Sequence, residues 1–158
     1  MAFQICGLAP HQFSHLFSLN DEELHIQGID RHIADEAFSF PCRVSLEDAD
    51  IGEELLLLNF AHLKTTSAYQ ANGPIFVRRN AIEAPIFVDQ LPPMLDQVHR
   101  LFSVRAFDST DRMVEAEVAS STELQALLDN FLLKPQVHYL HVHFARRGCF
   151  AARVDRIN

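Results

Sequence analysis

The pattern of hydrophobic and polar positions predicts more strands than helices. Apolar and polar residues alternate in PCRVSL (41–46), which is typical of a strand with one buried face. EELLLLNF (53–60) is apolar at consecutive positions, as expected for a strand that is covered on both faces. The same criteria predict further strands in GPIFVRR (73–79), in a hairpin over 102–119 that turns at Ser109 to Asp111, and in two closing segments over 137–145 and 149–154.

Helical spacing occurs in fewer segments. Two capping-box patterns mark helix starts, because Asn20 is followed by Glu23 and Ser120 is followed by Glu123. Apolar residues at helical intervals follow the second pattern and predict an amphipathic helix. We therefore expect helices over 20–28 and 120–133, with further helical turns over 10–17 and 92–101.

Strands thus outnumber helices, and short turns join most neighbours. A chain of 158 residues is long enough to bury one sizeable core. The order of elements predicts an α+β fold in which a single domain spans residues 1–158. That domain is expected to contain a largely antiparallel β-sheet with helices packed on one face.

Composition and charge restrict the class of protein. No stretch approaches the roughly 18–20 apolar residues of a membrane-spanning helix, and the first residues lack the basic start and apolar core of a secretory signal. The formal net charge of −8 argues against nucleic acid or an anionic membrane as the main partner. Three widely spaced cysteines, Cys6, Cys42 and Cys149, form no disulfide framework, so the sequence predicts a reducing, cytoplasmic setting.

The stretch HVHFARRGCFAARV (141–154) holds the densest candidate chemistry. The alternation of its two strands favours a three-residue turn from Arg146 to Gly148, which places His143 opposite Ala151. One face of the hairpin is then apolar core. The other face carries Tyr139, His141, His143, Cys149 and Arg153.

Arginines inside predicted strands point to a second kind of chemistry. An arginine in a strand is costly to bury unless it is paired. For Arg105 the sequence offers Glu115 or Glu117 across the predicted hairpin. No such partner is evident for Arg43 or Arg153, and the planar guanidinium suits bidentate binding of carboxylate or phosphate.

The first functional hypothesis is therefore a pocket for a small anionic ligand. Its binding residues would be His141, Arg153, Arg43 and Tyr139. If the protein is an enzyme, His143 is the candidate acid/base and Cys149 the candidate nucleophile.

Two other hypotheses stay open. His141 and His143 are separated by one residue in a strand, so they point the same way and would supply two metal ligands, with Cys149 or the distant His62 as the third. The alternative of a different class is a non-catalytic interaction or assembly module, whose polar hairpin face meets another chain, such as its own copy in a homodimer. The sequence identifies no cofactor, substrate or reaction.

Four segments carry a resemblance to one bacterial family: FPCRVSLEDADIGEELLLLNF, GPIFVRR, SVRAFD and HVHFARRGCFAARV. In these segments the chain resembles the family known as domain of unknown function 1203 (DUF1203). The similarity runs over nearly the whole chain in the same order, and the last motif is the most specific. The family has no established activity, so the resemblance implies a compact, single-domain bacterial protein and assigns no catalytic residues.

Overall fold

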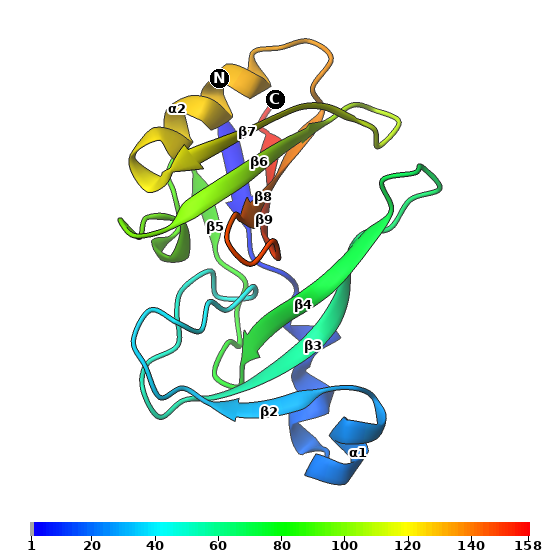
Figure 1. Ribbon diagram of the computed structural model, residues 1–158, viewed down its shortest axis with the longest axis vertical. Coiled ribbons are helices and arrows are strands. Elements are labelled where there is room, and N and C mark those ends of the chain that lie inside the picture. Colours follow the sequence, from blue (N-terminus) through cyan, green and yellow to red (C-terminus); the bar gives the residue numbers. More distant parts are fainter. Residues whose placement is uncertain (1) are drawn as a thin grey trace.

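The structure is a computed structural model that describes residues 2–158 and contains two antiparallel sheets (Figure 1). The larger sheet has the strand order β5-β1-β9-β8-β6-β7, and the smaller sheet has the order β2-β3-β4. The strands are β1 (Phe3–Cys6), β2 (Asp30–Ile33), β3 (Glu54–Leu63), β4 (Ala71–Arg78), β5 (Ile86–Val88), β6 (Leu101–Phe107), β7 (Met113–Ser120), β8 (Tyr139–Phe144) and β9 (Phe150–Arg156). The helices are α1 (Asp21–Ile26) and α2 (Ser121–Leu132), with short 3-10 turns at Pro10–Gln12, Ser14–Ser18 and Pro93–Leu95.

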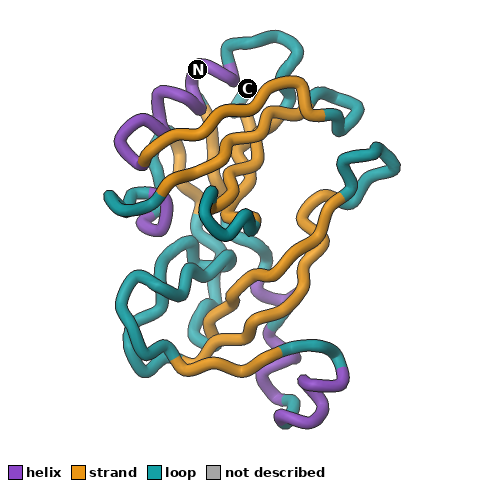
Figure 2. The backbone as a smooth tube through the Cα atoms, viewed as in Figure 1, coloured by secondary structure: helices purple, strands orange, loops and turns teal. Residues whose placement is uncertain are grey.

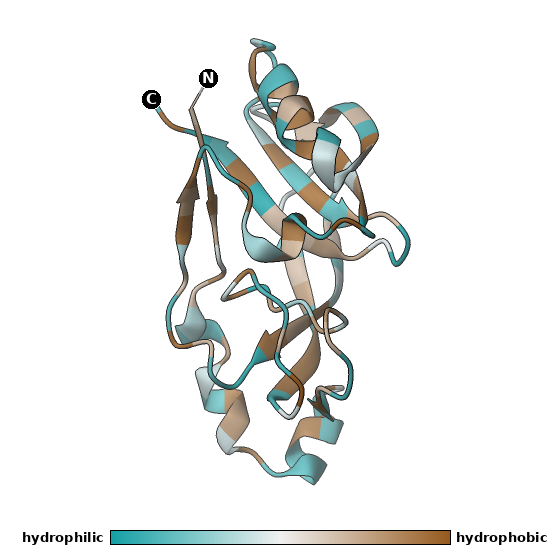
Figure 3. Ribbon diagram, turned by 90° about the vertical axis from the view of Figure 1, so that its left-hand side faces the viewer, coloured by the Kyte–Doolittle hydropathy of each residue, from teal (hydrophilic) through white to brown (hydrophobic). Residues whose placement is uncertain are grey.

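Helix α2 covers one face of the larger sheet (Figure 2). It begins at the Ser120 capping box, as the sequence predicts. Its buried stripe packs on alternate strand residues, among them Val104 and Val142, and Figure 3 shows hydrophobic and hydrophilic residues alternating along the strands. Because successive side chains point to opposite faces of a sheet, Arg105 and His141 face away from α2.

The smaller sheet packs against the N-terminal segments. Leu56 of β3 and Val77 of β4 are buried in one cluster with Phe13 and with Leu24 of α1. Figure 1 shows α1 at the end of the molecule remote from α2, so the two helices do not lie on one common face. The predicted α+β fold with largely antiparallel strands is confirmed. Within residues 2–158 no helix combines the length and the apolar character needed to cross a bilayer.

The segment over 41–46 is a turn, and the strand predicted there is wrong. Only isolated bridges occur, such as that between Cys42 and Phe76. The Leu46 N–H donates to the Cys42 carbonyl, and Leu46 has a φ of 58°. Cys42, Val44 and Leu46 are nevertheless fully buried, so the alternating pattern indicated burial and not strand pairing.

The helix predicted over 92–101 is also wrong, because a single 3-10 turn replaces it. The guanidinium of Arg100 donates to the carboxylate of Asp48 and to the carbonyl of Met94. A continued helix would need that carbonyl for the amide of Val98. The chain instead turns Arg100 inward and leaves Val98 exposed.

The β8–β9 hairpin contains a β-bulge, and the predicted pairing of His143 with Ala151 is wrong. His143 pairs with Phe150, and Ala151 is an extra residue. The turn consequently has four residues and is closed by a hydrogen bond from the Phe144 N–H to the Cys149 carbonyl. The bulge reverses the alternation next to the turn. Phe150 therefore shares the face of His143, whereas Cys149 moves to the side of Phe144.

Candidate functional site

Three histidines from the two sheets meet on the face of the larger sheet that α2 leaves uncovered. His141 and His143 lie on β8, and His62 lies on β3 of the smaller sheet. One ring nitrogen from each histidine can be chosen such that all three lie within 4.8 Å of one another. We call His62, His141 and His143 the histidine cluster.

Two β-bulges position these side chains. The pairing of β3 with β4 shifts by one residue between Phe60 and Leu63, which is where His62 lies. The bulge in β9 turns Phe150 onto the same face, where its ring stacks on that of His62 with centroids 5.1 Å apart and planes 7° apart. Bulges commonly redirect side chains near functional sites, and here both act on one cluster.

The hydrogen bonding of the histidine cluster is incomplete. His141 is 1% exposed, and neither of its ring nitrogens has a hydrogen-bond partner in the described residues. The buried Nδ1 of His62 also has none. The Nδ1 of His143 lies 3.0 Å from the carbonyl oxygen of Gly148. A carbonyl only accepts, so this contact requires Nδ1–H and leaves the Nε2 lone pair of His143 free.

Burial keeps the rings neutral. Desolvation is the main cause that lowers the pKa of His141 to about 3 and that of His143 to about 4. The pKa of His62 is lowered as well, first by desolvation and then by the charge of Arg105. Neutral imidazole offers a free lone pair, which is the form that binds metal ions.

Arg105 lies beside the histidine cluster without an acidic partner. It pairs across the sheet with His141 on one side and with Ala116 on the other, so Glu115 and Glu117 point to the opposite face. The predicted ion pair with these glutamates is therefore wrong, and Glu115 binds Lys134 instead. In residues 2–158 the one hydrogen bond that Arg105 donates through its side chain runs from Nε to the Ser103 hydroxyl, at 3.3 Å.

Tyr139 and Arg153, two of the predicted ligand-binding residues, lie next to the cluster but are engaged elsewhere. The guanidinium of Arg153 lies 3.9 Å from the ring centroid of Tyr139, and its Nε donates to Asp155 at 2.9 Å. The Tyr139 hydroxyl donates to Asp111 at 2.7 Å. Burial and this carboxylate together raise the pKa of Tyr139.

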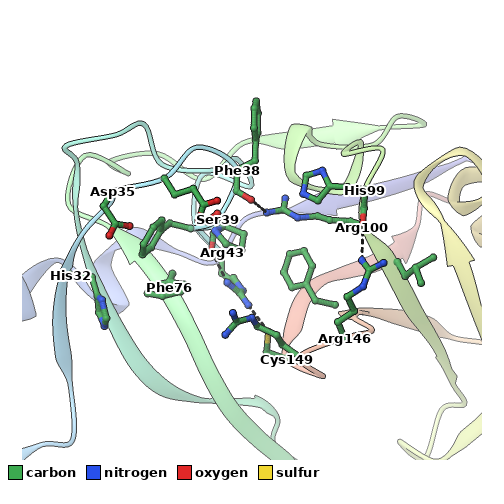
Figure 4. Close-up of a pocket in the computed structure, with 16 residues that line it drawn as sticks. His32, Asp35, Phe38, Ser39, Arg43, Phe76, His99, Arg100, Arg146 and Cys149 are labelled. Carbon is green, nitrogen blue, oxygen red and sulfur yellow. Dashed lines mark hydrogen bonds between the residues drawn. The ribbon is translucent and has the colours of Figure 1, made fainter.

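A cavity of about 480 Å³ lies between the two sheets, on the other side of the β8–β9 turn (Figure 4). The three histidines of the cluster do not line it. Four arginines contribute to its walls, so we call it the arginine cavity. Its lining includes Asp35, Glu36, Phe40, Arg43, Phe76, Arg100, Phe144, Arg146, Arg147 and Cys149.

Arg43 is the most deeply buried charge in the arginine cavity. It is 2% exposed, and its guanidinium donates to the carbonyls of Phe150 and Pro41 at 2.8 Å and 2.6 Å. Its third hydrogen bond goes to the Cys149 sulfur, at 3.2 Å, and Figure 4 shows these two side chains meeting. No carboxylate forms an ion pair with Arg43 in residues 2–158, and desolvation lowers its pKa. The buried cation is thus hydrogen-bonded but not neutralised.

The six predicted site residues are therefore divided between two places. His141 and His143 belong to the histidine cluster, and Tyr139 and Arg153 lie beside it. Arg43 and Cys149 belong to the arginine cavity. The sequence offers His62 as a possible third ligand, but it does not predict the positions of Arg105 and Phe150, because these depend on strand order and on the bulge.

Comparison with known proteins gives one match. A search of curated proteins and a search of solved structures each found no significant match. A family model described as "Protein of unknown function (DUF1203)" matches residues 39–156. That range includes the histidine cluster, Arg105, Arg43 and Cys149. The chain therefore belongs to the DUF1203 family, as the resemblance of its segments indicated.

Proposed function

We propose that the protein binds a transition-metal ion through the histidine cluster. The observation that carries the proposal is the convergence of three neutral imidazoles whose nitrogens are buried and largely without partners. A buried polar group without a hydrogen bond costs about 1–3 kcal/mol. A metal ion bound to the free lone pairs would remove that cost at several atoms at once.

The donor set restricts the kind of ion. Imidazole nitrogens suit Zn²⁺, Cu²⁺, Ni²⁺ and Fe²⁺, whereas Mg²⁺ and Ca²⁺ prefer oxygen ligands. Three protein ligands with one open position are typical of catalytic zinc sites. The hydrogen bond between His143 and the Gly148 carbonyl resembles the outer contacts that orient metal-binding histidines. Zn²⁺ is therefore the ion we expect.

Metal analysis of untagged protein, purified without chelators, tests the proposal. Wild-type protein is expected to bind zinc stoichiometrically, and His62→Ala is expected to lose most of it. His62 is the least buried of the three ligands, so its replacement leaves the core intact. His138→Ala, which changes an exposed histidine of the same C-terminal region, is the matched control. Equal zinc in wild type and His62→Ala, or none in the wild type after exposure to zinc, would contradict the proposal.

We also propose that the arginine cavity binds a small molecule with an anionic group. Support comes from Arg43, a buried cation without a carboxylate partner at the edge of a cavity with aromatic walls. A ligand carboxylate or phosphate would supply the missing negative charge. Cys149 remains the candidate nucleophile, and its sulfur accepts a hydrogen bond from Arg43 at the wall of the cavity.

Alkylation of the cysteines tests this second function. Inorganic phosphate, used as the probe anion, is expected to slow the reaction of Cys149 with iodoacetamide, while the reaction of Cys6 serves as the internal control. Mass spectrometry of the digested protein measures both rates. Equal effects of phosphate on the two cysteines would count against an anion site in the cavity.

A further inference from the structure

The charge around the histidine cluster suggests what occupies the remaining coordination position of the ion. Three neutral imidazoles leave the double positive charge of a zinc ion uncompensated. The charged side chains that act on the cluster are arginines, and Arg105 acts on all three rings. No carboxylate belongs to the candidate ligand set found among residues 2–158. A metal ion at this site would therefore favour an anion from outside the chain.

Arg105 is placed to bind such an anion. Its residue lies directly opposite His141 in the β6–β8 ladder, on the same face of the sheet. Directly opposed residues have Cβ atoms about 4.5–5.5 Å apart, so the Arg105 side chain leaves the backbone next to that of His141, a proposed metal ligand. The only side-chain hydrogen bond of Arg105 in the described residues uses Nε and leaves the Nη groups without protein acceptors.

The rest of the sheet face fits this arrangement. Ser103 lies opposite His143, two residues from Arg105 in β6, and accepts from its Nε. This contact fixes the guanidinium on the cluster side of the strand. A planar guanidinium with free Nη groups binds carboxylate or phosphate through two parallel hydrogen bonds.

We infer that the metal site binds a small oxyanion group, a carboxylate or a phosphate, with one oxygen on the metal ion and another held by Arg105. This inference rests on the metal site proposed above and names the ligand class of that site. It is independent of the arginine cavity, because neither Arg105 nor the three histidines line that cavity. Arg105 acts here as a binding and specificity residue.

Cobalt-substituted protein provides the test, because the visible spectrum of Co²⁺ responds to a change of its ligands. Acetate and inorganic phosphate are titrated separately at constant ionic strength into wild type, Arg105→Gln and Arg105→Lys. Saturable spectral changes are expected in the wild type with at least one of the two anions, and the tighter anion identifies the preferred group. The apparent Kd for the anion is expected to rise at least tenfold in Arg105→Gln and by less in Arg105→Lys. Lysine keeps the charge but lacks the planar guanidinium that donates two parallel hydrogen bonds.

Arg112→Gln is the matched control, because Arg112 is exposed and bonds within the turn of the same β6–β7 hairpin. Its anion affinity is expected to equal that of the wild type. A normal cobalt spectrum that anions leave unchanged, or change equally in wild type and Arg105→Gln, would overturn this inference alone. Failure of the wild type to bind cobalt at all would overturn the metal proposal and this inference with it.

Discussion

The β8–β9 hairpin supplies two polar sites that differ in how their buried groups are satisfied. On one side, His141 is neutral, and its two ring nitrogens have no partner among the described residues. On the other side, Arg43 carries a charge and donates hydrogen bonds to two backbone carbonyls and to a sulfur. Both sites lie where the smaller sheet meets the larger one.

The difference indicates two kinds of role. Unpaired nitrogens add nothing to the stability of the metal-free fold, and the metal site proposed above would account for their retention. The bonds of Arg43 tie the turn near Pro41 to β9, so that side chain also holds the structure together. Substitutions on the two sides should therefore change stability in opposite directions.

The largest effect is expected for Arg43→Ala. Loss of the guanidinium leaves the carbonyls of Phe150 and Pro41 without donors and empties a buried volume, so the free energy of unfolding should fall by about 3–5 kcal/mol. Urea denaturation measures this change. Arg43→Lys should recover little of the lost stability, because one ammonium group cannot donate to both carbonyls with the geometry of the guanidinium. A loss below about 1 kcal/mol in Arg43→Ala would show that these hydrogen bonds are not structural.

Acid should destabilise the metal-free protein through the histidine cluster. The pKa values of His141 and His143, about 3 and about 4, lie below the unfolded value of about 6.5. Between these limits the unfolded chain binds more protons, so the free energy of unfolding falls as pH drops below 6.5. Linkage gives a loss of about 2 kcal/mol per ring at pH 5.

Chemical denaturation between pH 8 and pH 5 measures this effect, and His141→Phe isolates one ring. Between pH 8 and pH 5 the free energy of unfolding of the variant should fall by about 2 kcal/mol less than that of the wild type. If the free energy of unfolding fell equally with pH in the two proteins, the low pKa of His141 would be contradicted. Above pH 7 the free energy of unfolding should show no contribution from the titration of these rings.

A smaller effect of the opposite sign is expected for His141→Phe at pH 8 without metal. An apolar ring of similar size removes unpaired nitrogens from the core, so the free energy of unfolding should rise by about 1 kcal/mol. Excess zinc should reverse the order, since only the wild type would gain stability from the ion. Thermal denaturation with and without zinc measures both differences. If His141→Phe were clearly less stable than the wild type without metal, the expectation that substitutions at His141 and Arg43 change stability in opposite directions would be wrong.

The smallest effect is expected for Arg153→Gln. This arginine lies opposite His141 in the β8–β9 ladder, but its side chain is 47% exposed and its ion pair with Asp155 is at the surface. Exposed pairs contribute less than about 1 kcal/mol, so urea denaturation should barely distinguish the variant from the wild type. A loss comparable with that of Arg43→Ala would mean that proximity to the cluster, rather than burial, sets the energetic role of these arginines.

Local features of the fold were predictable, and pairings between distant segments were not. The capping box at Ser120 and the apolar stripe after it depend on neighbouring residues, and α2 follows them. The continuous apolar run at 53–60 likewise became part of β3. The division into two sheets depends on which strands pair, and the alternation within each strand does not specify that choice.

In the candidate site, too, local features were predictable and contacts between distant segments were not. His141 and His143 share a face because of their spacing alone, and the sequence was sufficient to predict that. The separation of Cys149 from His143 depends on a bulge that brings Phe150 against His62, a residue about ninety positions earlier in the chain. Tertiary packing thus overrode a register that was consistent with the local pattern.

The bulge at Ala151 makes the register of this segment as important as its composition. Deletion of Ala151 would make the ladder regular and would keep Phe150 opposite His143. A slip of β9 that pairs Ala151 with His143 would instead turn Phe150 to the side of Arg43 and Cys149 to the side of the histidines. The pairing of β9, and not the letters of the HVHFARRGCF motif alone, therefore decides which site each of these side chains serves.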